Sequence, residues 1–374
     1  MATRITDVPS FPAAGWYGSA WWSAPPEVNR KPVAPQVGSW SGLTPSRVRD
    51  KCGWRMTNTG GPEITVVVPT YRRPSLLAKC LGSLATQDLD PDRFEVVVVD
   101  DASGPETREV LEELSSAWPQ LRWLVQDVNC GPAAARNRGI AAARSPLLLF
   151  VDDDIVAAPD LIPVHLRYHT DTDGLLGVVG LVQWLPGLRV TPFMQWLDST
   201  DLQFSYGTWM REGRIERPWD AFYTCNLSLS AAMIGAVGGF DERFPYPAFE
   251  DVELGFRLSR QGFRLDYRPD ALAWHARTME LDGFCRRMGQ VGESVTVLRV
   301  VQPDAPFDVP ADVEGQRRWR TGARHVVAAV AKVTPSDRIR ALHYRAEINQ
   351  AYREGVRRGR ARVADLARER DLES

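Results

Sequence analysis

The sequence predicts an α/β protein with a mostly parallel sheet flanked by helices. Between residues 64 and 151, apolar runs of strand length alternate with helical patterns, as in strands joined by crossover helices. The runs are apolar at consecutive positions, which is typical of strands buried on both faces. Polar residues directly follow several of these runs, at the sheet edge where ligands bind in such folds. The 374 residues allow one large domain of this kind with attachments.

The first part of the chain supplies these strands and helices in strict alternation. Ser103 and Glu106 have the spacing of a capping box, with Pro105 in the first turn, so one helix is expected to begin there. Strands are expected at 64–68, 94–99, 121–125 and 147–151, and helices from 74, from about 103 to 116, and at 133–143.

After residue 159 the pattern becomes mixed. Short strands are expected near 177–184, 222–229, 263–267 and 271–274, with a helix at about 251–260. Beyond about residue 278 the chain is expected to be helical to its end, with prolines interrupting it at 303–310 and near 335.

Three regions differ in composition. Residues 1–62 contain eight prolines and five tryptophans without a regular period, and they are expected to form an irregular arm. Residues 63–300 are expected to be the α/β domain, with halves at 63–155 and 156–276. Residues 301–374 are expected to form a basic helical extension, because residues 315–374 carry 15 Lys or Arg against 7 Asp or Glu, a charge of +8. Such helices suit an anionic membrane surface, a homodimer contact, or packing on the acidic remainder of the chain.

Composition excludes several classes of protein. The net charge is -2, without the basic excess of a dedicated nucleic-acid-binding protein. No apolar run reaches the roughly 18 residues of a membrane span, and the first ten residues lack a secretory pattern. The five cysteines are odd in number and form no CxxC, which disfavours a disulfide scaffold or a zinc ribbon. We therefore expect a cytoplasmic protein, with peripheral contact at the inner face of the membrane as an open alternative.

The chemistry is expected to depend on carboxylates, because the sequence contains neither a dinucleotide-binding glycine motif nor a P-loop. Asp152, Asp153 and Asp154 follow a buried strand, where their mutual repulsion favours a bound cation over a solvated acidic turn. Alternate residues of an extended segment point the same way, so Asp152 and Asp154 can share one Mg²⁺ or Mn²⁺ while Asp153 faces elsewhere. His165 and His169 have a chelating spacing, but no third zinc ligand accompanies them.

Six motifs together resemble those of family 2 glycosyltransferases with the GT-A fold. They occur in the order seen in that family, and the resemblance covers about residues 63–276. They are residues 66–71 (VVVPTY), 98–103 (VVDDAS), 129–139 (NCGPAAARNRG), 150–154 (FVDDD), 238–242 (GGFDE) and 249–257 (FEDVELGFR).

The resemblance implies a role for each matching residue. The implied donor-binding residues are Pro69, Thr70 and Tyr71 around the nucleoside, Asp100 and Asp101 at the base or ribose, Arg136 near the base and diphosphate, Asp152 and Asp153, and Asn226 near the transferred sugar. Asp152 and Asp154 would form the D-x-D metal site for Mn²⁺ or Mg²⁺, which His275 would complete unless it is only a structural histidine. Asp251 would be the base that deprotonates the acceptor hydroxyl, and Glu250 would raise its pKa or hold the acceptor.

These residues predict an inverting, metal-dependent glycosyltransferase. It would move a sugar from a nucleoside-diphosphate sugar, UDP-linked rather than GDP- or dTDP-linked, to a hydroxyl of a glycan, a lipid-linked precursor or a natural product. The alternatives are a nucleotidyltransferase, which usually has a Gly-rich loop after its first strand, and an inactive sugar-nucleotide or carbohydrate-binding module. Four tryptophans would either stack on the acceptor or pack in the core, namely Trp184, Trp196, Trp209 and Trp219.

Overall fold

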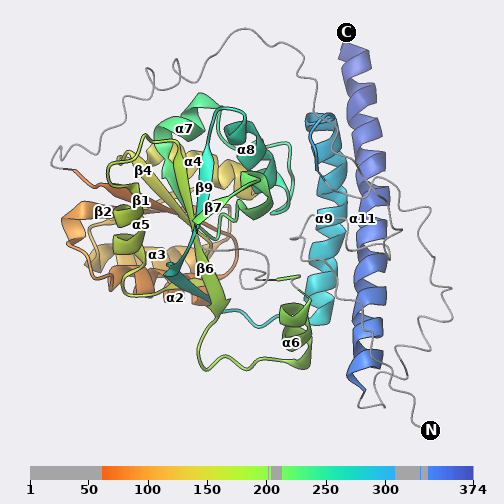
Figure 1. The fold of residues 1–374 in the computed structure, drawn as a ribbon, viewed down its shortest axis with the longest axis horizontal. Helices are drawn as coiled ribbons and strands as arrows, with labels where there is room; N and C mark the ends of the chain where they lie inside the picture. Colours follow the sequence, from red (N-terminus) through yellow and green to blue (C-terminus); the bar gives the residue numbers. More distant parts are fainter. Residues whose placement is uncertain (1–60, 201, 204–212, 308–328, 330–335, 374) are drawn as a thin grey trace.

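The computed structural model describes residues 61–200, 202–203, 213–307, 329 and 336–373. Its centre is a 9-stranded sheet in the order β3-β2-β1-β4-β8-β6-β9-β5, with β7 paired to β9 (Figure 1). The strands are β1 Ile64–Thr70, β2 Phe94–Asp100, β3 Leu121–Val125, β4 Leu147–Val151, β5 Ile155–Ala157, β6 Leu176–Trp184, β7 Gly213–Ile215, β8 Asn226–Ser230 and β9 Arg264–His275.

Helices flank this sheet, as the sequence predicts for an α/β fold. The helices are α2 Pro74–Ala85, α3 Pro105–Ala117, α4 Pro132–Ala142, α5 Leu161–His169, α6 Pro192–Ser199, α7 Ala231–Ala236, α8 Glu250–Ser259, α9 Leu281–Val301 and α11 Asp337–Glu373. Two short 3-10 turns, η2 Pro91–Arg93 and η4 Pro218–Ala221, precede β2 and β8.

The first half of the sheet is parallel. β1 pairs in parallel with β2 and β4, and β2 pairs in parallel with β3. All residues of β2 and β4 are buried, which explains the continuous apolar runs at 96–99 and 147–151. α4 packs closely on β1 and β2 because it is rich in Ala and Gly. A side chain at Gly139 would overlap that of Val67 on β1.

Antiparallel pairings add the later strands to this parallel half. β8 lies antiparallel between β4 and β6, whereas β6 and β9 are parallel. The two strands expected near 263–267 and 271–274 form one strand, β9, with an irregularity where Arg268 pairs Gly180 and Leu272 pairs Leu181. Pro269 lies in this irregularity, since a proline has no N–H to donate to a ladder.

The capping box expected at Ser103 is not formed. Gly104 is the N-cap of α3, with a φ of 121°, and no side chain caps the helix. The Ser103 hydroxyl instead accepts the backbone N–H of Arg72 at 2.8 Å. The Ser103 side chain therefore binds the loop after β1, whereas the local sequence pattern predicts that it caps α3.

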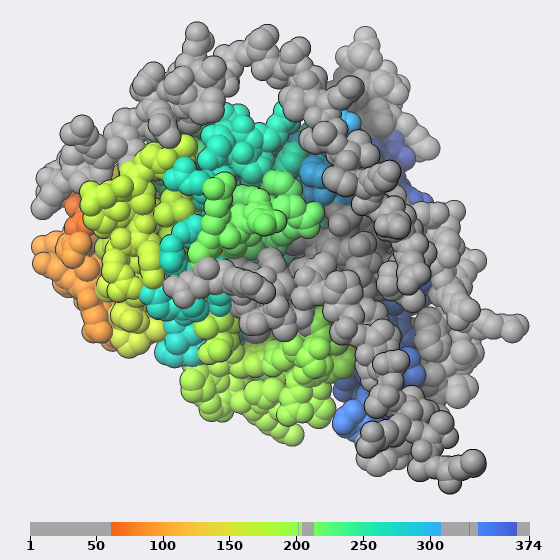
Figure 2. All heavy atoms as spheres, viewed as in Figure 1, coloured from red at the N-terminus to blue at the C-terminus, as the bar shows by residue number. Residues whose placement is uncertain are grey.

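The described parts of the C-terminal region include two helices, α9 and α11, which run side by side in the same direction (Figure 1). They share a second hydrophobic cluster with residues of α6 and α8. In the space-filling view of Figure 2, the first strands and helices (orange) and α11 (blue) lie at opposite sides of the molecule. None of the helices in the described ranges combines the length and apolar character needed to cross a bilayer.

Candidate active site

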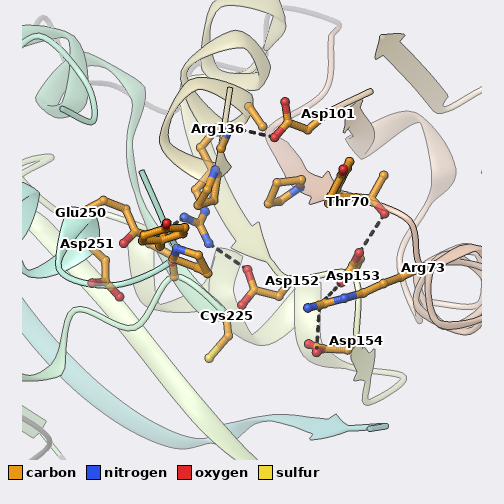
Figure 3. A pocket seen from close by; sticks show the side chains of 18 of the residues that line it. Thr70, Arg73, Asp101, Arg136, Asp152, Asp153, Asp154, Cys225, Glu250 and Asp251 are labelled. Atoms are coloured by element: carbon orange, nitrogen blue, oxygen red, sulfur yellow. Dashed lines mark hydrogen bonds and ion pairs between the residues drawn. The ribbon is translucent and has the colours of Figure 1, made fainter. Parts of the chain in front are cut away.

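A pocket of about 530 Å³ lies where the carboxyl ends of β1, β4 and β9 meet the first turn of α8. This is the edge of an α/β sheet where ligands bind. Eleven of the thirteen site residues expected from the sequence line the pocket (Figure 3). They are Pro69, Thr70, Tyr71, Asp101, Arg136, Asp152, Asp153, Asp154, Glu250, Asp251 and His275.

Arg136 joins the two halves of the domain. Its side chain projects from α4, is almost fully buried, and donates from Nη1 to Glu250 Oε1 at 2.8 Å and from Nη2 to Asp152 Oδ1 at 2.9 Å. One guanidinium thus fixes the end of β4 relative to the start of α8. The paired carboxylates make Arg136 an internal counterion in this structure.

The acidic triplet after β4 is neutralised by the chain itself. Asp153 accepts the Thr70 hydroxyl at 2.8 Å and Arg73 Nη1 at 2.9 Å, and the same Arg73 nitrogen lies 3.3 Å from Asp154 Oδ2. Asp153 therefore does not face away from the site, because these two partners hold it at the pocket wall. Burial raises the pKa of Asp153 to about 6 although Arg73 opposes that rise. The repulsion that favoured a cation on sequence grounds is thus partly relieved by arginine.

Asp154 and His275 face each other across a short gap. Asp154 Oδ2 lies 3.5 Å from His275 Nε2, while His275 Nδ1 lies 3.1 Å from the carbonyl oxygen of Arg277. Burial lowers the pKa of His275, and it would raise that of Asp154, but nearby His275, Arg73 and Arg277 outweigh burial and lower the Asp154 pKa. A neutral imidazole and an ionised carboxylate are the forms that bind metal ions.

These two residues fit a divalent cation that takes its remaining ligands from elsewhere. The described residues contain no group of three His, Cys, Asp or Glu side chains placed to hold a metal ion. Asp152, the other expected ligand, is turned toward Arg136 (Figure 3). Mg²⁺ and similar ions at phosphate-handling sites commonly use one or two protein ligands with phosphate oxygens and water. Asp154 and His275 are consistent with that arrangement.

Asp251 has a raised pKa and lines the pocket beside Glu250. It follows Glu250 in the first turn of α8, and its Oδ1 accepts the N–H of Val252 at 2.8 Å. Burial, followed by the charge of Glu250, raises the Asp251 pKa to about 8. Glu250 is bound to Arg136 through Oε1, and its buried Oε2 has no hydrogen-bond partner within the described part of the chain. The two carboxylates therefore differ in environment although they are adjacent in sequence.

Asp101 lines the pocket, and Asp100 does not. Asp100 is buried and accepts the N–H of Ser103 at 3.0 Å, which stabilises the turn after β2. Both Asp101 oxygens accept several donors, including the backbone N–H groups of Cys130 and Gly131, each at 2.8 Å. Asp101 thereby positions the loop that leads into α4.

Asn226, expected near the transferred sugar, does not line the pocket either. It is fully buried in β8, where its amide oxygen lies 2.9 Å from His165 Nε2 and its amide nitrogen donates to the carbonyl of Ala271 at 2.9 Å. Ser228 Oγ lies 2.7 Å from His165 Nδ1 and 2.8 Å from His169 Nε2. Burial lowers the pKa of both histidines, so this cluster is a neutral hydrogen-bond network in the core.

The tryptophans within the described ranges pack against protein groups. Trp184 donates to Asp198 at 2.8 Å and stands edge-on to the His275 ring, with centroids 5.5 Å apart. Trp196 stacks on Phe193, and Trp219 meets Phe256 edge-on. None of these three lines the pocket, which favours the core-packing interpretation. Trp209 lies outside the described residues.

Three arginines of the pocket were missed by motif reading, namely Arg73, Arg277 and Arg287. Arg73 immediately precedes α2, Arg277 comes two residues after β9, and Arg287 lies within α9. A cationic residue next to a strand end is a signal that the sequence offers, but an arginine inside a helix such as α9 gives none.

The sheet topology, with a parallel half extended by antiparallel pairings, is that of a GT-A fold. Residues 65–221 match the family model described as glycosyl transferase family 2. The fold is also similar to that of a mannosyltransferase from Pyrobaculum calidifontis solved with GDP-mannose and Mn²⁺, with a TM-score of 0.52, 16% identity, and coverage of 83% of this chain and 93% of that one.

Curated relatives carry glycosyltransferase names. A validoxylamine A glucosyltransferase of Streptomyces hygroscopicus subsp. limoneus is 34% identical over 242 residues, which cover 59% of this chain and 53% of the relative. A pre-mycofactocin glycosyltransferase of Mycobacterium tuberculosis is 30% identical over 249 residues, covering 65% of this chain and 48% of the relative. The chain thus spans about half the length of these relatives.

Proposed function

We propose that this chain is an inverting glycosyltransferase that moves a sugar from a nucleoside-diphosphate sugar to an acceptor hydroxyl with the help of a divalent cation. The observation that carries the proposal is Asp251, a partly buried carboxylate with a raised pKa in the same pocket as Asp152, Asp154 and Arg136. The family of residues 65–221 and the names of the relatives support sugar transfer.

The proposed reaction is a single displacement at the anomeric carbon. Asp251 accepts the proton of the acceptor hydroxyl, and the acceptor oxygen bonds to the anomeric carbon from the face opposite the diphosphate. The bond from that carbon to the diphosphate oxygen breaks, and the nucleoside diphosphate leaves with the electron pair. A base with a pKa of about 8 must be ionised to act, so the rate rises with pH through about 8.

Asp154 and His275 would hold the cation. Asp152, which faces Arg136 and not His275, would contact the donor. A bound divalent cation supplies a positive charge that stabilises the departing diphosphate. Thr70, Tyr71 and Asp101 line the side of the pocket next to α4, where the nucleoside is expected. We favour a UDP-sugar as the donor. The proposed acceptor is a hydroxyl group of a glycan, a lipid-linked precursor or a natural product.

The experiment measures donor turnover with and without acceptor candidates. A panel of UDP-, GDP- and dTDP-sugars is incubated with Mn²⁺, Mg²⁺ or EDTA, and the released nucleoside diphosphate is measured. Asp251→Asn is expected to lower turnover about 10²–10⁴-fold while it still binds the nucleotide. Asp173→Asn, which removes a carboxylate that pairs with Arg264 outside the pocket, is the matched control and is expected to keep wild-type turnover.

Two results would contradict the proposal. Full transfer activity of Asp251→Asn would remove Asp251 as the base. Nucleotide-sugar binding without turnover of any donor, under every metal condition, would favour the inactive binding module instead.

A further inference from the structure

Three cationic or basic groups converge on one carboxylate oxygen of the pocket. Asp154 Oδ2 lies 3.3 Å from Arg73 Nη1, 3.5 Å from His275 Nε2 and 3.7 Å from Arg277 Nη1. The two arginines are far apart in the sequence, because Arg73 follows β1 and Arg277 follows β9. Figure 3 shows Arg73 reaching between Asp153 and Asp154. The oxygen that suits a metal ion is therefore already shared by two guanidinium groups.

Arg277 is in an unfavourable environment for a positive charge. Burial lowers the pKa of Arg277, and the charges of Arg73 and Arg287 lower it further, against the opposing effect of Asp154. The Arg73 and Arg277 side chains remain 41% and 36% exposed, and both line the pocket. Asp154, in contrast, is buried. The pocket thus holds partly exposed positive charge around a buried carboxylate, an arrangement that an additional anion would stabilise.

We propose that Arg73 and Arg277 bind the diphosphate group of the donor, and that they pair with Asp154 only while the diphosphate is absent. This inference rests on the proposed function, because it assigns the part of the same pocket that receives the diphosphate. A diphosphate offers each guanidinium a stronger partner than a shared carboxylate oxygen. Asp154 then becomes free for the cation.

The proposal predicts that the cation and the diphosphate strengthen each other's binding. A cation and the guanidinium groups compete for Asp154 Oδ2, so the arginines weaken cation binding in the empty pocket. The diphosphate draws the arginines away, so it strengthens cation binding, and the cation strengthens diphosphate binding to the same extent. Removal of Arg277 therefore has opposite effects on the two affinities, which a merely structural role would not produce.

The test measures Mn²⁺ binding by electron paramagnetic resonance without nucleotide, and binding of pyrophosphate, UDP and UMP by calorimetry at saturating Mn²⁺. Arg277→Met is expected to tighten Mn²⁺ binding severalfold and to weaken pyrophosphate and UDP about tenfold. UMP, with one phosphate, is expected to change less than about twofold because the lost contacts are to the diphosphate. Arg277→Lys keeps the charge and is expected to give intermediate values.

Arg264→Met is the matched control, because Arg264 also lies on the β9 side and pairs with Asp173 outside the pocket. It is expected to change none of the four affinities. The proposal is overturned if Arg277→Met leaves pyrophosphate and UDP binding unchanged, or if it weakens Mn²⁺ binding together with them. Failure of the proposed function would give a different result. Arg277→Met would still show the expected changes in affinity, but the wild-type chain would turn over no nucleotide sugar.

Discussion

At the residue scale, two adjacent carboxylates acquire different properties from their surroundings. Glu250 is paired with the buried Arg136, so its negative charge is compensated. Asp251 accepts the backbone N–H of Val252, and burial together with the Glu250 charge raises the Asp251 pKa to about 8. In many active sites, neighbouring carboxyl groups in different environments have different pKa values, and one of them transfers the proton. The raised pKa also makes the folded state less stable at any pH above the ordinary pKa of an aspartate.

Asp251→Asn is therefore expected to stabilise the protein at alkaline pH. The folded-state pKa of Asp251 is raised above its unfolded value, so wild-type stability falls as pH rises from about 4 to about 8 and then levels off. A neutral amide removes this loss. Even one unit of pKa shift corresponds to about 1.4 kcal/mol, or a melting temperature about 3 °C higher for the variant at pH 8.5.

Thermal unfolding at pH 4, 6 and 8.5 checks this expectation. The difference between variant and wild type should grow with pH. A difference that is the same at all three values would show that the Asp251 carboxyl titrates normally.

At the scale of elements, the extension is attached through a helix pair that glycine allows to approach closely. A Cβ at Gly355 of α11 would overlap the carbonyl of Gly289 on α9, and one at Gly292 would overlap the carbonyl of Tyr352. Arg358 of α11 also pairs with Glu293 of α9 at 2.5 Å. Because α9 carries Arg287 into the pocket, the packing of α11 supports the wall of the site.

Gly355→Leu is expected to lower the free energy of unfolding by about 1–3 kcal/mol, since the side chain must push the two helices apart. Gly283→Ala in α9 is the matched control. A Cβ there meets only a flexible arginine end at 3.7 Å, so the better helix propensity of Ala should leave stability unchanged or raise it by up to about 1 kcal/mol. Chemical denaturation measures both variants, and equal effects of the two substitutions would contradict the packing argument.

At the scale of the whole molecule, the pocket depends on both halves of the domain. β1, β4 and α4 supply one wall, and β9, α8 and α9 supply the other. Arg136 crosses between them through its contacts with Asp152 and Glu250. A ligand that fills the pocket therefore contacts groups that are brought together only by the complete fold.

UDP with Mn²⁺ is expected to raise the melting temperature of the whole domain. At about one hundred times the dissociation constant, the stabilisation is about 2.7 kcal/mol, which corresponds to roughly 5–10 °C for a domain of this size. Asp154→Asn should lose the part of this shift that Mn²⁺ adds and keep the part due to UDP alone. An unchanged melting temperature of the wild type at saturating UDP and Mn²⁺ would argue against nucleotide binding in this pocket.

The sequence by itself determined the elements and most of the site. Continuous apolar runs specify strands buried on both faces, and the polar residues that follow β1, β4 and β9 are carried to one edge by the direction of the chain. This local logic located the acidic triplet, whereas the roles expected for Arg136, Glu250 and Asp251 came from the resemblance to family 2 glycosyltransferases. The local logic failed at Ser103, where a tertiary hydrogen bond to Arg72 replaces the helix cap.

The tertiary structure alone decided which of these residues are available to a ligand. Asn226 and Asp100 have the polarity of binding residues, but packing buries the first among core histidines and ties the second to a turn. Arg73 and Arg277 meet at Asp154 although about two hundred residues separate them, because β1 and β9 end at the same edge of the sheet. Periodicity reports the burial of each element, whereas exposure, charge compensation and long-range contacts depend on how the elements pack together.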